Sequence, residues 1–230
     1  MSHLVREDLI KESEPEYAER LQIFFKTGKG EYGEGDVFHG VRVPKQRKIA
    51  KKHSGVPIEE VLKLLHSEFH EERLTALFIL VAKYQRGDNR KREKIVSIYL
   101  DNTDWVNNWD LVDSSAPKIL GDWLQDRPRE ILYELARSES LWKRRISIIS
   151  TFAFIDKGEY SDAIALAEIL IDDDHDLIHK ASGWVLREVG KNDEERLLSF
   201  LNKHSHEMPR TMLRYSIEKL EESKRKHYLS

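Results

Sequence analysis

The 230-residue chain contains no cysteine, which excludes a disulfide framework, catalysis by a thiol and a zinc site built from thiolates. It contains no run of 18 apolar residues, so we expect no membrane-spanning helix. The N-terminal segment M-S-H-L-V-R-E-D-L-I-K-E is charged from its sixth position on and lacks the apolar core of a signal peptide. We therefore expect a cytoplasmic protein that makes no contact with a membrane.

Strand-like alternation of apolar and polar residues is also missing. Apolar residues recur instead with a helical period almost everywhere, as in E-Y-A-E-R-L-Q-I-F-F, P-I-E-E-V-L-K-L-L and E-R-L-T-A-L-F-I-L-V-A-K-Y. The breaks between these segments are short and carry glycine, aspartate or asparagine, as in R-G-D-N and V-G-K-N-D. The sequence predicts an all-α chain of about a dozen helices.

The helices repeat. Four segments align with one another: E-E-R-L-T-A-L-F-I-L, K-R-R-I-S-I-I-S-T-F, I-H-K-A-S-G-W-V-L-R and M-P-R-T-M-L-R-Y-S-I. A period in the mid-thirties with two helices per unit is typical of a helical solenoid. We predict one domain, residues 1–230, folded as a right-handed superhelical solenoid of HEAT-like repeats. The aligned column contains Arg73, Arg145, Lys180 and Arg210, and Trp109 falls midway between the first two.

Residues in the same register of successive repeats are expected to line one concave wall, which makes this wall a basic groove. Rows of cations bind phosphate, and arginine does so with two parallel hydrogen bonds. The alternative is that a basic residue in this register braces neighbouring repeats. One helical turn further on, the register contains Asp113, Trp184 and Arg214.

Acidic residues are absent from one stretch of the chain. The formal net charge of −3 argues against a protein that coats nucleic acid indiscriminately. The net charge hides an uneven distribution of acidic and basic residues along the chain, which is compatible with one positively charged surface. Solvated helix faces of a charge-rich protein would give the same pattern. The acid-free stretch runs from Val37 to Ile58, and its basic residues include Lys45, Arg47, Lys48 and Lys51.

The segment W-V-N-N-W-D-L-V-D places Trp109 and Asp113 four residues apart, on one face of a helix. A carboxylate repels phosphate, but it stabilises positive charge that develops on a sugar during cleavage of an N-glycosidic bond. An indole face attracts a cationic base, and a base that is already cationic leaves without a general acid. Together with Arg145 and Trp184, this pair suits removal of a cationic base from DNA.

The motifs N-W-D-L-V-D, W-K-R-R-I-S-I and K-A-S-G-W-V-L-R-E resemble those of the AlkD-type DNA alkylation repair glycosylases. The resemblance extends from F-F-K-T-G-K-G-E-Y-G-E-G-D to G-W-V-L-R-E-V-G, which is most of the chain. It implies a HEAT-like solenoid that removes N3- and N7-alkylated purines without a metal or other cofactor. The implied partner is double-stranded DNA carrying alkylated bases, bound by a monomer in the nucleoid region.

The resemblance also implies roles for individual residues. Trp109 and Trp184 would face the lesion nucleotide and its backbone, Asp113 would be the catalytic carboxylate near the sugar, and Arg145 would hold the phosphate. We add two further basic residues of the same motifs, Arg144 and Arg187, to the expected DNA contacts.

The glycine-rich loop, residues 28–40, spells G-x-G-x-x-G at its start. A dinucleotide site would need a strand before it and a helix after it, and an amphipathic helix precedes it instead. We interpret the loop as a flexible connection that lets Tyr32 or the next basic helix approach the ligand. Pro44 is expected to open that helix.

Two histidine pairs, His66/His70 and His175/His179, have the spacing of metal ligands on a helix. Neither pair has a third ligand in an obvious place, so we interpret them as helix-end residues and predict no metal site. Two other functions fit the chain in principle. One is a catalytically silent HEAT-like DNA-binding protein, expected to lack the Trp-Asp pair; the other is a protein-interaction scaffold, expected to present an apolar or acidic groove.

Overall fold

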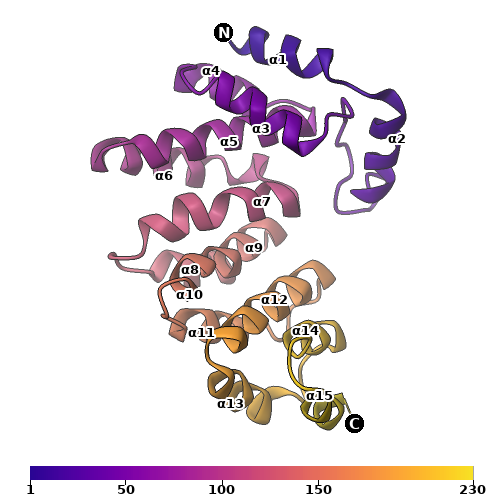
Figure 1. The fold of residues 1–230 in the computed structure, drawn as a ribbon, viewed down its shortest axis with the longest axis vertical. Coiled ribbons are helices and arrows are strands. Elements are labelled where there is room, and N and C mark those ends of the chain that lie inside the picture. Colours follow the sequence, from indigo (N-terminus) through magenta and orange to yellow (C-terminus); the bar gives the residue numbers. More distant parts are fainter. Residues whose placement is uncertain (230) are drawn as a thin grey trace. The chain divides into compact units, whose positions relative to one another are not determined.

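A computed structural model describes residues 1–229 of the chain. These residues form two compact units that divide after Ser115, and both units are built from helices (Figure 1). Within the described residues, the only β-type pairing is an isolated bridge between Val37 and Phe69. The predicted all-α class is confirmed.

The first unit is organised around one long helix, α5. Its central sequence T-A-L-F-I-L-V is buried on all sides, because α5 packs against α1, α3, α4 and α6. A helix that is apolar around its whole circumference has to lie inside its domain. The helices of this unit are α1 (Ser2–Lys11), α2 (Pro15–Phe24), α3 (Val43–Lys52), α4 (Ile58–Leu65), α5 (His70–Arg86), α6 (Asn89–Asp101), the 3₁₀-helix η1 (Thr103–Trp105) and α7 (Trp109–Ala116).

The first turn of α5 is polar and nevertheless buried. Glu71 accepts hydrogen bonds from the backbone N–H groups of His39, Gly40 and Val41 at 2.8–3.1 Å. Its neighbour Glu72 accepts from the guanidinium of an α1 residue, Arg6, at 2.8 Å. These buried carboxylates therefore satisfy the otherwise unpaired donors of the loop and tie the N-terminal segment to α5.

The second unit is organised around α12, which packs against α9, α13 and α14. The contact with α14 is close at Gly183, where an added Cβ would lie 2.5 Å from the carbonyl oxygen of Met212. The helices of this unit are the π-helix η2 (Pro117–Gly121), α8 (Glu130–Ala136), α9 (Leu141–Ser150), α10 (Phe152–Ile155), α11 (Ser161–Ile169), α12 (Asp176–Asn192), α13 (Glu194–His204), α14 (Arg210–Ser216) and α15 (Glu222–Leu229).

The five residues of the aligned column fall in five different helices, α5, α7, α9, α12 and α14. Successive members lie two helices apart, as in a repeat of two helices per unit, except between α9 and α12, where the four-residue helix α10 adds one. The single domain, the right-handed superhelix and the concave basic groove stay predictions. Across residues 1–229, no helix combines the length and apolar character that crossing a bilayer requires.

Candidate nucleic-acid interface and catalytic residues

Trp109 and Asp113 both lie in α7, one turn apart on its less buried side. Leu111 and Val112, between them, are fully buried, whereas the Trp109 and Asp113 side chains are partly exposed. Asn108 precedes the helix, and its side-chain oxygen accepts the Trp109 backbone N–H at 2.8 Å. The apolar positions of α7 thus fix which face it buries and leave an indole and a carboxylate on the other.

Aromatic rings from the N-terminal segment surround Trp109. Its indole stacks on Phe25, with centroids 5.2 Å apart and planes 24° apart, and meets the edge of Phe24 at 5.7 Å. Phe24, although apolar, is 60% exposed. A cavity of about 210 Å³ adjoins these rings, and its other lining residues include Tyr17, Phe38, Val43, Gln46, His70 and Asp110.

A buried ionic network lies beside the indole. The His70 imidazole contacts Asp36 through Nδ1 and Asp110 through Nε2, both at 2.9 Å. Burial alone would lower the pKa of His70, but the charges and hydrogen bonds of the two carboxylates outweigh burial and raise it to about 9. His70 is therefore an imidazolium near neutral pH and donates to both carboxylates. The Phe25 and Phe38 rings lie against it at 4.7 and 4.9 Å.

Arg73 belongs to this network. Its guanidinium donates to Asp36 at 2.5 Å and to the carbonyl oxygens of Ser67 and Glu68 at 2.8 and 3.1 Å. Only 2% of Arg73 is exposed. Arg73 thus braces the loop against α5. Bracing was the alternative to a phosphate contact for residues of the aligned column.

Ser115, two residues after Asp113, forms a buried hydrogen bond that joins α7 to α6. The Tyr99 hydroxyl lies 3.0 Å from the Ser115 Oγ, and Ser115 donates to the carbonyl oxygen of Leu111 at 2.6 Å. Burial raises the pKa of Tyr99 well above its usual range, and the negative charge of Asp113 adds to this effect. The backbone that carries Asp113 is consequently held from the buried side of the helix.

The predicted residues of the second unit lie in α9 and α12. The Trp184 ring contacts Phe152 at 4.6 Å and is partly exposed. Arg145 is 5% exposed and donates to the carbonyl oxygen of Leu177, in the first turn of α12, at 2.7 Å. Arg145 therefore makes at least one contact that braces α9 against α12.

Several other predicted DNA contacts have partners inside their own unit. Arg144 donates to Asp173 at 2.5 Å, and Lys180 pairs with Asp176 at 2.7 Å. Three more residues have partners: Arg187 contacts Glu218, Arg210 donates to the carbonyl oxygen of Leu229, and Lys45 contacts both Glu12 and Glu14.

A smaller set of basic side chains is exposed. Lys48 and Lys51 extend from α3, and Arg47 lies beside them over the Phe78 ring, 4.2 Å from its centroid. Arg214 is exposed on α14. In the glycine-rich loop, Tyr32 is partly exposed and lies under the Lys26 ammonium at 6.0 Å.

Two metal ligands four positions apart would both lie within one helix, and neither histidine pair does so. His66 follows the end of α4, where it contacts Asn102 and the Trp105 ring, whereas His70 opens α5. His175 caps α12, and His179 lies inside that helix with its ring on the Asp173 carbonyl oxygen. No cluster of three or more potential ligands occurs within the described part of the chain.

Sequence reasoning missed the site around His70. Its residues come from the loop, from α5 and from α7, so no local pattern groups them. The usable signal was the double phenylalanine at Phe24 and Phe25, because two aromatic residues at the end of an amphipathic helix need a partner.

The chain is similar to known proteins over nearly its whole length. A sequence model of a family described as DNA alkylation repair enzyme matches residues 5–220. One similar solved structure is described as a predicted DNA alkylation repair enzyme from Enterococcus faecalis, with a TM-score of 0.68 and 18% identity. The match covers 92% of this chain and 98% of that one, and at this identity the likeness concerns the fold. No curated protein matches.

Proposed function

The chain belongs to the DNA alkylation repair enzyme family, and from this premise we propose that it is a DNA glycosylase acting on cationic N3- and N7-alkylated purines in duplex DNA. One observation carries the proposal: α7 presents the partly exposed carboxylate of Asp113 one turn after the indole of Trp109. A carboxylate repels phosphate, so a surface that only bound the DNA backbone would have no use for it.

The proposed reaction is hydrolysis of the bond between C1′ and the alkylated base. The bonding electron pair moves onto the base, which cancels its positive charge and makes it a neutral leaving group. Water adds at C1′, and its proton leaves to Asp113 or to solvent. The Asp113 carboxylate stabilises the oxocarbenium-like sugar between these events. Because the base carries its own charge, the reaction requires neither a general acid nor a metal ion.

Trp109 has a supporting role in this proposal. Phe25 covers one face of the indole, which fixes the ring and limits the rotamer freedom that it would lose on binding. A fixed, electron-rich ring attracts a cationic base more strongly than a neutral one. We assign Trp184 and Arg145 to the same reaction on the resemblance of their motifs.

Exposed basic residues supply the proposed contacts to the DNA backbone. Lys48 and Lys51 are the clearest candidates, because both are exposed on α3 and neither has an ion pair within the described residues. Two other residues of α3, Val43 and Gln46, line the cavity that adjoins Trp109.

The deciding experiment is release of 7-methylguanine and 3-methyladenine from methylated duplex DNA by the purified protein, measured by chromatography. We expect release well above the spontaneous rate of a protein-free control. DNA binding without release would favour a silent DNA-binding protein. A protein that neither binds DNA nor releases bases would leave the interaction scaffold as the better explanation.

A further inference from the structure

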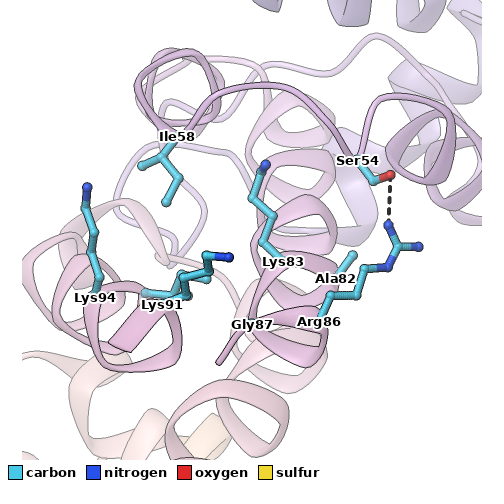
Figure 2. A pocket seen from close by; sticks show the side chains of 9 residues that line it. Ser54, Ile58, Ala82, Lys83, Arg86, Gly87, Lys91 and Lys94 are labelled. Atoms are coloured by element: carbon cyan, nitrogen blue, oxygen red, sulfur yellow. Dashed lines mark hydrogen bonds between the residues drawn. The ribbon is translucent and has the colours of Figure 1, made fainter. Parts of the chain in front are cut away.

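A second cavity of the first unit has a basic lining. It measures about 420 Å³ and lies where α5 ends and α6 begins, next to the connection between α3 and α4. We call it the α5–α6 basic pocket. Its residues are Ser54, Ile58, Ala82, Lys83, Arg86, Gly87, Lys91, Lys94 and Ile95, and in Figure 2 the three lysine side chains lie around Ile58.

The pocket lies away from the residues proposed for base removal. Lys83 follows His70 by thirteen positions on the same helix, which at 1.5 Å per residue is about 20 Å. His70 contacts Asp110 of α7 and lines the other cavity. The two cavities therefore lie at opposite ends of α5.

The positive charge in the pocket is poorly balanced. Of its four cations, Lys91 alone has an ion pair within residues 1–229, with Asp88 at 3.6 Å. Arg86 donates to an uncharged group, the Ser54 hydroxyl, at 3.2 Å (Figure 2). Burial lowers the pKa of Lys83, and Glu59 offsets this effect only in part. An anion bound in the pocket would compensate these charges.

The helix ends beside the pocket do not need these cations. Arg92 already donates to the carbonyl oxygens of Gly87 and Gln85, at 3.1 and 3.4 Å, at the end of α5. At the start of α6, the Asp88 side chain accepts the backbone N–H of Lys91 at 2.9 Å. Stabilisation of the helix dipoles therefore does not account for Lys83 and Lys94.

The lining also has an apolar part, formed by Ile58, Ala82 and Ile95. Pockets of about 300–1,000 Å³ that combine apolar walls with a few convergent polar groups are typical of sites for organic ligands. Arginine and lysine together provide both a bidentate and a point-charge contact for phosphate.

We propose that the α5–α6 basic pocket binds a phosphate group carried on an organic body, with the cations on the phosphate and the apolar wall on the base or sugar. Two sources have this chemistry: a free nucleotide, and a nucleotide unit of a DNA strand outside the segment that contacts α7. This proposal does not depend on glycosylase activity, because it concerns the other end of α5.

The test compares two double variants of the full chain. Lys83→Gln/Lys94→Gln removes two pocket charges, and glutamine keeps helix propensity close to that of lysine. Lys11→Gln/Lys157→Gln removes the same charge from exposed positions outside the pocket. Circular dichroism and thermal unfolding establish that both variants fold. Binding of ADP and pyrophosphate is then measured by calorimetry, and binding of an unmethylated duplex by fluorescence anisotropy over a range of salt concentrations.

If the ligand is a free nucleotide, wild type and the control variant bind ADP, and the pocket variant binds it at least tenfold more weakly. If the ligand is DNA, ADP does not bind, and only the pocket variant has a lower duplex affinity, with a salt slope reduced by about one for each phosphate that it no longer binds. Equal decreases in both variants would show a generic charge effect. That result, or wild-type binding by the pocket variant, would overturn the proposal.

Discussion

The imidazole of His70 lies 2.9 Å from the carboxylate of Asp110, and this contact joins α5 to α7 at the residue that follows Trp109. Asp36 holds the other side of the same ring at 2.9 Å. The network is charge-balanced, because two carboxylates face the imidazolium and the guanidinium of Arg73. The indole is thus positioned by ionic contacts that depend on one histidine proton.

This dependence predicts a loss of stability at alkaline pH. The folded-state pKa of His70, about 9, is raised above its ordinary value of 6.5. The stability that follows from this shift is therefore fully present below about pH 6.5 and is lost as the pH rises through about 9. Below about pH 6.5, the shift contributes on the order of 3 kcal/mol to the free energy of unfolding.

Urea denaturation at several pH values tests this prediction. Wild type should lose stability between about pH 6.5 and 9, whereas His70→Gln should be less stable at neutral pH and nearly insensitive over that range. His66→Gln is the matched control, because His66 is an exposed helix-end histidine, and it should keep the wild-type slope. If the stability of His70→Gln decreases with pH as steeply as that of wild type, His70 is not the group that causes the decrease.

Arg73→Ala should affect stability rather than DNA binding. The substitution leaves Asp36 buried beside His70 without its guanidinium partner, and breaking a buried pair from one side costs about 3–5 kcal/mol. The affinity of the folded fraction for duplex DNA and its salt dependence should not change.

Lys48→Gln is the complementary variant, because Lys48 is exposed on α3. Its stability should stay within about 0.5 kcal/mol of wild type, while the salt slope of duplex binding falls by about one. If Arg73→Ala instead lowers the salt slope and Lys48→Gln leaves it unchanged, Arg73 contacts the DNA and Lys48 does not.

Gly183→Ala should destabilise the second unit, although alanine is the better helix former by about 1 kcal/mol. The added methyl group would lie 2.5 Å from both the Met212 carbonyl oxygen and the Tyr215 Cβ, so α12 and α14 would have to separate. Overpacking of this kind costs about 1–3 kcal/mol, and we expect a lower Tm. Gly55→Ala is the control, since its Cβ would meet no atom within 4 Å; an equal effect of both variants would exclude close packing as the cause.

Local patterns predicted the helices and the common face of Trp109 and Asp113, because both follow from a period that the sequence displays directly. The fate of the aligned basic residues could not be predicted in the same way. Register places Arg73 and Lys180 at equivalent points, yet the first is buried on Asp36 and the second is 40% exposed beside Asp176. The difference arises from the loop, which places Asp36 over the first turn of α5.

The polar start of α5 illustrates the same limit. H-E-E-R is typical of a solvated first turn, since acids favour helix N-termini. In the structure, Glu71 is 1% exposed because it binds three loop N–H groups, which come from residues about 30 positions earlier. Burial of this kind depends on tertiary contacts, and a single sequence does not reveal them.

Asp113→Asn separates an enzyme from a DNA-binding protein. The amide keeps the size of the side chain but removes the charge that would stabilise the sugar cation. Release of 7-methylguanine or 3-methyladenine should fall by roughly 10²–10³-fold, as for removal of one electrostatic interaction in a transition state. Duplex affinity should hold or rise, because a charge that repels phosphate has been removed.

Asp110→Asn, on the same helix, provides the contrast. Asp110 contacts His70 at 2.9 Å, so its amide should lower the Tm, while release per folded molecule should fall far less than in Asp113→Asn because the carboxylate near the sugar is kept. For Asp113→Asn we expect the reverse, a small change in Tm and a large decrease in release. If Asp113→Asn instead lowers the Tm and releases bases at the wild-type rate per folded molecule, Asp113 is a structural carboxylate and the proposed mechanism is wrong.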